Sequence, residues 1–210
     1  MGKDWYDHER QEREPRPICR KLPVLDPALW PMYDYYLRAR SLDSGLARYN
    51  LWYPSHAAGD FWDRIVIPCT SQVPGNLYWQ ARSMAGQEPR YQSPANSRED
   101  SLVVVWPRGS SSQTPRIVVE GPMDALAAAQ HGCVGIALMG LTPSAQVFGH
   151  LMSLCFHHPV VVVVDRDAQE TGISIQLWLA QEGIRARIAS PYPYNDLAEM
   201  DREARQEILR

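Results

Sequence analysis

The segment Val160-Val-Val-Val-Val-Asp165-Arg-Asp167 carries the strongest structural signal in the chain, because an unbroken apolar run ends in two acidic residues. A related pattern lies upstream, where Ile117-Val-Val is followed by Glu120-Gly-Pro-Met-Asp124. Short runs of β-branched residues that are apolar on both faces are typical of strands buried in a parallel sheet. Both runs are therefore predicted to be strands of one sheet that end in acidic side chains.

The chain after Pro115 alternates between such runs and helical patterns, as in a succession of βαβ units. In sheets of this kind, ligands bind beyond the carboxyl ends of the strands, which is where the acids lie. The further elements predicted here are helices at 122–131, 144–156 and 173–182 and strands at 134–138 and 184–189.

Crowded carboxylates repel one another, and a divalent cation is the usual compensation. Mg²⁺ and Mn²⁺ prefer oxygen ligands, so the acids predict a metal site. Alternate residues of an extended segment point to one side, so Asp165 and Asp167 are expected to share this site, with Glu120 and Asp124 close by. For Asp124, stabilisation of a helix N-terminus is an equally good interpretation.

The chain before Pro115 differs in composition and in its predicted elements. Residues 1–26 are polar and rich in proline, and we expect a flexible arm. Residues 27–107 predict a smaller mixed α+β subdomain, with helices within 27–50 and strands at 64–68, 77–82 and 102–106. The loop at 108–115 separates it from a second domain at 116–210.

Composition excludes several classes of protein. The formal net charge of −3 gives no sign of nucleic-acid binding, and acidic residues outnumber basic ones after residue 107, so any contact with nucleic acid is expected to be local. The four cysteines contain no Cys-x-x-Cys pair, which argues against a zinc knuckle or a disulfide framework and favours the reducing cytoplasm. The apolar runs are too short for a membrane span, so no membrane association is expected.

The sequence resembles the Toprim domain of DnaG-type primases at three places: Glu120-Gly-Pro-Met-Asp, Ala137-Leu-Met-Gly-Leu-Thr and Val160-Val-Val-Val-Val-Asp-Arg-Asp. The resemblance implies an α/β fold in which a Toprim-type parallel sheet is flanked by helices. It also implies that Glu120 acts as the acid/base or metal-poising carboxylate, and that Asp165 and Asp167 hold Mg²⁺ or Mn²⁺.

A further acidic element of this family has the form Lys-Asp-x-Asn-Asp/Glu, and here Tyr192-Pro-Tyr-Asn-Asp196 stands in its place. Asn195 and Asp196 match the pattern, but Pro193 replaces the first aspartate. One metal is therefore a safer expectation than two. Asp196 is either a metal ligand or the cap of a terminal helix predicted at 197–209.

The region upstream of the Toprim motifs resembles the N-terminal subdomain of phage and bacterial primases. The matching segments are Tyr36-Leu-Arg-Ala-Arg-Ser-Leu, Arg64-Ile-Val-Ile-Pro, Tyr78-Trp-Gln-Ala-Arg82-Ser and Glu88-Pro-Arg90-Tyr91. We expect the three arginines to face the acids and bind nucleotide or template phosphates, although they could also be solvated at strand ends. Tyr91 could stack on a base or pack in the core.

The predicted activity is synthesis of short RNA primers on a single-stranded DNA template from nucleoside triphosphates. Two alternatives stay open: a metal-dependent Toprim nuclease, and a non-catalytic nucleic-acid-binding protein of the replisome. Since the sequence has neither a four-ligand zinc pattern nor a phosphate-binding loop, a separate zinc-binding protein and a replicative helicase are the expected partners. Such a divided arrangement suits a phage or mobile element.

Overall fold

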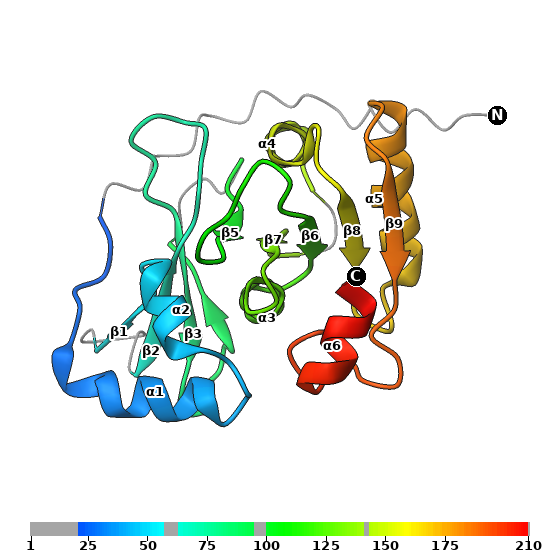
Figure 1. Ribbon diagram of the computed structural model, residues 1–210. Coiled ribbons are helices and arrows are strands. Elements are labelled where there is room, and N and C mark those ends of the chain that lie inside the picture. Colours follow the sequence, from blue (N-terminus) through cyan, green and yellow to red (C-terminus); the bar gives the residue numbers. More distant parts are fainter. Residues whose placement is uncertain (1–20, 57–62, 95–99, 141–142, 210) are drawn as a thin grey trace.

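The computed structural model describes residues 21–56, 63–94, 100–140 and 143–209. Within these ranges the strands form two sheets (Figure 1). The first sheet is antiparallel and has the order β1–β2–β3–β4. Its strands are β1 (Tyr53–Ser55), β2 (Arg64–Pro68), β3 (Trp79–Ser83) and β4 (Tyr91–Gln92).

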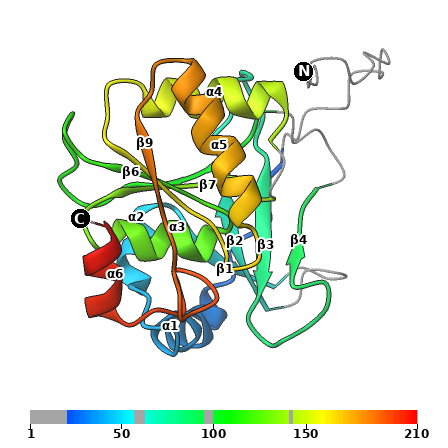
Figure 2. The same cartoon turned by 90° about the vertical axis from the view of Figure 1, so that its right-hand side faces the viewer.

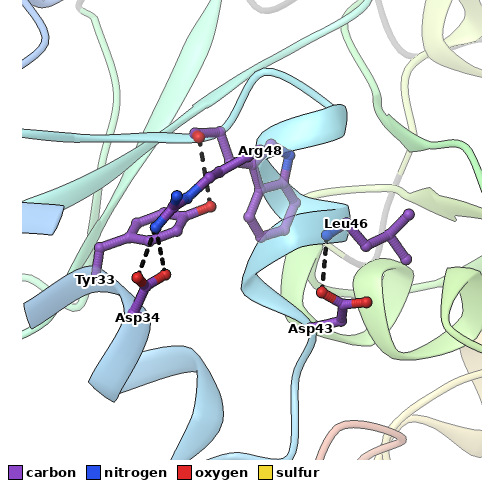
Figure 3. Close-up of polar contacts among 6 residues, drawn as sticks. Tyr33, Asp34, Asp43, Leu46 and Arg48 are labelled. Carbon is purple, nitrogen blue, oxygen red and sulfur yellow. Dashed lines mark hydrogen bonds and ion pairs between the residues drawn. The ribbon is translucent and has the colours of Figure 1, made fainter. Parts of the chain in front are cut away.

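The helices that precede the first sheet are η1 (Pro27–Leu29), α1 (Trp30–Arg38) and α2 (Ser44–Tyr49). Their local chemistry matches the predicted helical region, because a proline lies in the first turn of α1 and Asp43 caps α2 by accepting a hydrogen bond from the Leu46 amide (2.9 Å). Arg48 ties the two helices together. It donates to both carboxylate oxygens of Asp34 at 2.6 Å and lies against the ring of Tyr33 (Figure 3).

The second sheet has the order β5–β7–β6–β8–β9. Its strands are β5 (Val103–Val105), β6 (Arg116–Val119), β7 (Val134–Ala137), β8 (Val160–Val163) and β9 (Ala186–Ala189). All neighbouring strands in it are parallel except β5, which is antiparallel to β7. The strand predicted at 102–106 thus belongs to this sheet, whereas the sequence analysis grouped it with the upstream subdomain.

Helices cover both faces of the second sheet (Figure 2). They are α3 (Pro122–Ala129), α4 (Ala145–Cys155), α5 (Gln169–Gln181) and α6 (Arg202–Leu209). Val161 and Val163 pack in the core shared with α1, α2 and α3, while Val160 and Val162 pack against α4 and α5. Burial on both faces explains the unbroken valine run, and the predicted α/β fold class is confirmed.

Residue Gly135 permits the close contact between α3 and β7. A Cβ atom at this position would lie 2.1 Å from the carbonyl oxygen of Ala125, so only glycine fits there. The alanine-rich sequence of α3 serves the same purpose, because every residue of this helix is buried.

The structure differs from the predictions for the terminal helix and for part of the N-terminal arm. The helix predicted at 197–209 begins only at Arg202, because Asp201 caps it by accepting from the Ala204 amide (2.8 Å). Residues 1–20 of the predicted flexible arm lie outside the described residues, whereas Val24 and Asp26 hydrogen-bond to the β1 strand. None of the helices in the described ranges combines the length and apolar content needed to span a bilayer.

Candidate active site

The sheet order brings Glu120 and Asp165 together. Glu120 directly follows β6, Asp165 lies two residues after β8, and these strands are neighbours in the sheet. The two carboxyl groups are near enough to influence each other's ionisation. Burial, with the charge of Glu120 as a further cause, raises the pKa of Asp165 to about 7.

Asp167 is placed differently from the prediction. The chain turns immediately after the strand, with the Ala168 amide donating to the carbonyl of Asp165 (2.9 Å), so the extended geometry assumed for residues 165–167 is wrong. The Asp167 side chain is exposed and acts on Glu120 and Asp165 only through its charge. Its role as a direct metal ligand stays a prediction.

Asp124 is buried in the first turn of α3, behind the Glu120–Asp165 pair. Its Oδ1 accepts a hydrogen bond from the Ala198 amide (2.9 Å), which fixes the segment after β9 against α3. Burial, together with the charge of Asp196, raises the pKa of Asp124 to about 8. The side chain therefore connects two segments of the site in addition to lying in a helix N-terminus.

Asp196 lines the same cavity as Glu120, Asp124 and Asp165. It accepts a hydrogen bond from the Glu199 amide (2.7 Å) and so caps the turn before α6, which means that it is not the cap of the terminal helix. Burial raises its pKa, as it does for Glu120, Asp124 and Asp165, while the charge of Arg90 acts in the opposite direction.

Arg82 and Tyr91 face the acids from the first sheet, where they are paired across β3 and β4. The Arg82 guanidinium is almost fully buried, donates through Nε to the Tyr36 hydroxyl (2.7 Å) and stacks on the Tyr91 ring at 4.8 Å. Its orientation is thus set by two aromatic side chains. Arg90 is exposed and lines the cavity beside it.

Arg64 does not line this cavity. Its side chain is buried, and its guanidinium donates to the carbonyls of Ala81 (3.3 Å) and Pro89 (2.9 Å). Arg64 thereby holds the connection between β3 and β4, so it positions Arg90 and Tyr91 without reaching the acids itself.

The cavity has a volume of about 690 Å³ and an acidic and a cationic side. Two of its cations, Arg40 and Arg205, were not predicted. Arg40 follows α1 and lies in a quoted primase-like motif, which is a signal that could have identified it. Arg205 lies in the polar-looking α6, yet it is buried and donates to the carbonyls of Ala198 (2.7 Å) and Ser41 (3.5 Å). No local sequence pattern announces such burial.

The acids can accommodate Mg²⁺ or Mn²⁺ in a limited way. Among the described residues, no three His, Cys, Asp or Glu side chains are already arranged around one point as in a closed metal site. Mg²⁺, however, is commonly held by one or two carboxylates, with waters and substrate phosphates as the remaining ligands. The Glu120–Asp165 pair supplies two such carboxylates, and burial, together with the charges of the neighbouring acids, raises the pKa of both groups.

Comparison with known proteins identifies the fold. Residues 117–200 match the Toprim-like family, and no curated protein sequence matches the chain. The structure of a DnaG primase catalytic domain bound to ssDNA has a TM-score of 0.63 at 15% identity, over 87% of this chain and 70% of that one.

Two further solved structures are similar. The RNA polymerase domain of Mycobacterium tuberculosis DnaG has a TM-score of 0.62 at 16% identity, over 88% of this chain and 76% of that one. The E. coli primase catalytic core has a TM-score of 0.60 at 17% identity, over 87% and 74%. The chain has the fold of a DnaG primase catalytic core. In this DnaG-type fold, the Toprim-like part supplies the acids, and the part before it supplies Arg82 and Arg90.

Proposed function

We propose that the chain is the catalytic core of a DNA primase, which joins nucleotides into short RNA primers on single-stranded DNA. The observation that carries this proposal is the cavity with acids on one side and preoriented arginines on the other. Phosphoryl transfer needs both, because the charge of a triphosphate exceeds what one metal ion neutralises. The likeness to the DnaG primase catalytic domain bound to ssDNA supports the choice of template.

In the proposed reaction, Glu120 and Asp165 would hold Mg²⁺ or Mn²⁺ as carboxylates. When bound, the cation neutralises charge that develops on the transferring phosphoryl group. Asp167 and Asp196 add negative potential at this edge, and they are the candidates for further ligands. Asp124 orients the segment that contains Asp196 through its hydrogen bond to Ala198.

The arginines bind the triphosphate and set its position. Arg82 presents its guanidinium at an angle determined by Tyr36 and Tyr91, while Arg90 is free to follow the substrate because it is exposed. Arg64 positions the connection that carries Arg90 by donating a hydrogen bond to the Pro89 carbonyl. Tyr91 acts as the stacking partner of Arg82, so we propose an indirect role in place of contact with a base.

A primer-synthesis assay tests this function. With single-stranded DNA, labelled ribonucleotides and Mg²⁺ or Mn²⁺, the wild-type chain should form short RNA, and the Asp165→Asn/Asp167→Asn double variant should lose at least about a hundredfold of that rate. Glu182→Gln removes an exposed acid that does not line the cavity and is the matched control.

Equal, background-level synthesis by the wild type and the double variant, with a zinc-binding protein and replicative helicase supplied, would contradict the proposal. Metal-dependent cleavage of DNA or RNA in the absence of nucleotides would identify a nuclease. Metal-indifferent binding of single strands without synthesis would identify a non-catalytic replisome protein. The zinc-binding and helicase partners themselves stay predictions.

A further inference from the structure

A second cavity, of about 450 Å³, adjoins the one that contains the acids. The two cavities share the wall formed by Ala39, Arg40, Arg82 and Arg90. The volume of the second cavity lies in the range of pockets that bind small molecules. The proposed primer synthesis takes place in the acidic cavity, and no step of it is assigned to the second cavity.

The shared wall offers two guanidinium groups that are held by Tyr36. Arg40 lies 4.1 Å above the Tyr36 ring, and the hydroxyl of the same tyrosine accepts the hydrogen bond from Arg82. Glu88 is the acidic residue in this lining, and its carboxylate is engaged by the Arg90 amide (3.1 Å). The wall is therefore suited to a polyphosphate, which arginine forks bind with defined geometry.

The other side of the second cavity is apolar and aromatic. It is lined by Met32, Tyr35 and Met84, and the Tyr35 side chain is 76% exposed. An exposed aromatic ring beside thioethers suits the face of a nucleobase, since every base can stack there irrespective of its sequence. The two sides together match the two ends of a nucleotide.

Starting a chain without a primer requires two nucleotides at once, one to supply a 3′-hydroxyl and one to supply the α-phosphate. We propose that the second cavity binds the initiating nucleoside triphosphate, with its base against Tyr35 and its 3′-hydroxyl directed across the shared wall. This inference rests on the proposed primase function. The O3′–Pα bond forms, the bond from Pα to the leaving pyrophosphate breaks, and the hydroxyl proton passes to solvent.

The distribution of charge favours a single nucleotide over the template strand in this cavity. A bound strand carries one phosphate per nucleotide and needs cations along its path. Here the cations of the lining are confined to the wall with Arg40, Arg82 and Arg90, and the surface beyond it is apolar or neutral apart from Glu88. Arg82 and Arg90 bind the incoming triphosphate in the proposed reaction, so Arg40 is the guanidinium of this wall that is left for the triphosphate of the initiating nucleotide.

The experiment compares initiation with extension. Initiation is measured as dinucleotide formation on a template that specifies two different nucleotides, with the first one varied in concentration. Extension is measured on the same strand with an annealed RNA primer. Tyr35→Ala should raise the KM for the first nucleotide roughly tenfold, because one stacking contact is lost. Extension should stay within about twofold, and Tyr35→Phe should initiate nearly as the wild type does.

A second variant, Met32→Trp, fills the cavity instead of opening it and should also impair initiation selectively. Tyr49→Ala is the control, because this exposed tyrosine of α2 lines neither cavity. An unchanged KM in both Tyr35→Ala and Met32→Trp, or an equal loss of initiation and extension, would overturn the inference. A wild-type chain that fails to extend an annealed primer would instead overturn the primase function itself.

Discussion

Asp124 couples the active site to pH through its buried carboxyl group. The pKa in the folded state, about 8, lies above the ordinary value of 3.8, so the folded chain holds a proton that the unfolded chain has lost. In the absence of metal, the free energy of unfolding should therefore fall as the pH rises from about 4 to about 8. Asp165 contributes in the same direction.

The variant Asp124→Asn should reduce this pH dependence, because Asn carries no titrating group and its Oδ1 can still accept from Ala198. Urea unfolding at pH 5 and pH 8 in the presence of a chelator measures the effect. The variant should gain stability relative to the wild type at pH 8 and less so at pH 5. Glu182→Gln, which removes an exposed carboxylate, should parallel the wild type, and an identical pH slope for Asp124→Asn would contradict the assignment.

Arg64 and Arg90 separate support from binding at the scale of single residues. Arg64→Met should lower the free energy of unfolding by about 2 kcal/mol, because the carbonyls of Ala81 and Pro89 lose a charged donor. Arg90→Gln should change stability little, since the side chain is exposed, but should raise the KM for nucleotides. Thermal unfolding and primer extension distinguish the two; the opposite assignment of effects would refute this division of roles.

At the scale of elements, the contact between α3 and β7 is the most constrained. Gly135→Ala should destabilise the chain by about 3 kcal/mol, because the added Cβ would overlap the Ala125 carbonyl. Gly149→Ala is the matched control, since nothing lies within 4 Å of its added Cβ on the exposed side of α4. It should be neutral or stabilising by up to about 1 kcal/mol. Similar unfolding midpoints for both variants would argue against the packing described here.

A small set of polar contacts, in addition to the shared hydrophobic core, joins helices α3 and α6 to the loop between α1 and α2. Gln130, at the end of α3, accepts from the Asp43 amide (3.1 Å) and donates to the Ser41 carbonyl (3.0 Å), which Arg205 also contacts. These contacts link the part that carries Arg40 and Arg82 to the part that carries the acids.

Gln130→Ala should cost about 1–2 kcal/mol in stability and should lower primer extension more than this loss explains, because the arginines and acids would no longer keep their spacing. Unfolding and extension measured on the same preparation test this. Gln181→Ala, an exposed glutamine at the end of α5, is the control. Full activity in a destabilised Gln130→Ala chain would show that the contact stabilises the fold alone.

The helices and strands whose apolar residues follow a regular local spacing could be predicted from the sequence alone. Three such elements are the valine run of β8, the alanine-rich α3 and the strand Arg64–Pro68. They were predictable because burial on both faces and helical periodicity determine which residue types occupy consecutive positions. Glu120 and Asp165 were predictable as site residues for the same reason, since strand ends mark where ligands bind. The short strands β1 and β4 left no such record.

Which polar side chains line the cavity depends on the tertiary structure and could be predicted only in part from the sequence. Arg64 and Arg205 are both buried arginines, yet one supports a loop and the other lines the site, and this difference depends on residues far away in the chain. The turn after Val164, which leaves Asp167 exposed and outside the lining of the cavity, likewise depends on how the strand end meets its neighbours. Pairing across sheets is a non-local property, so no window of consecutive residues contains it.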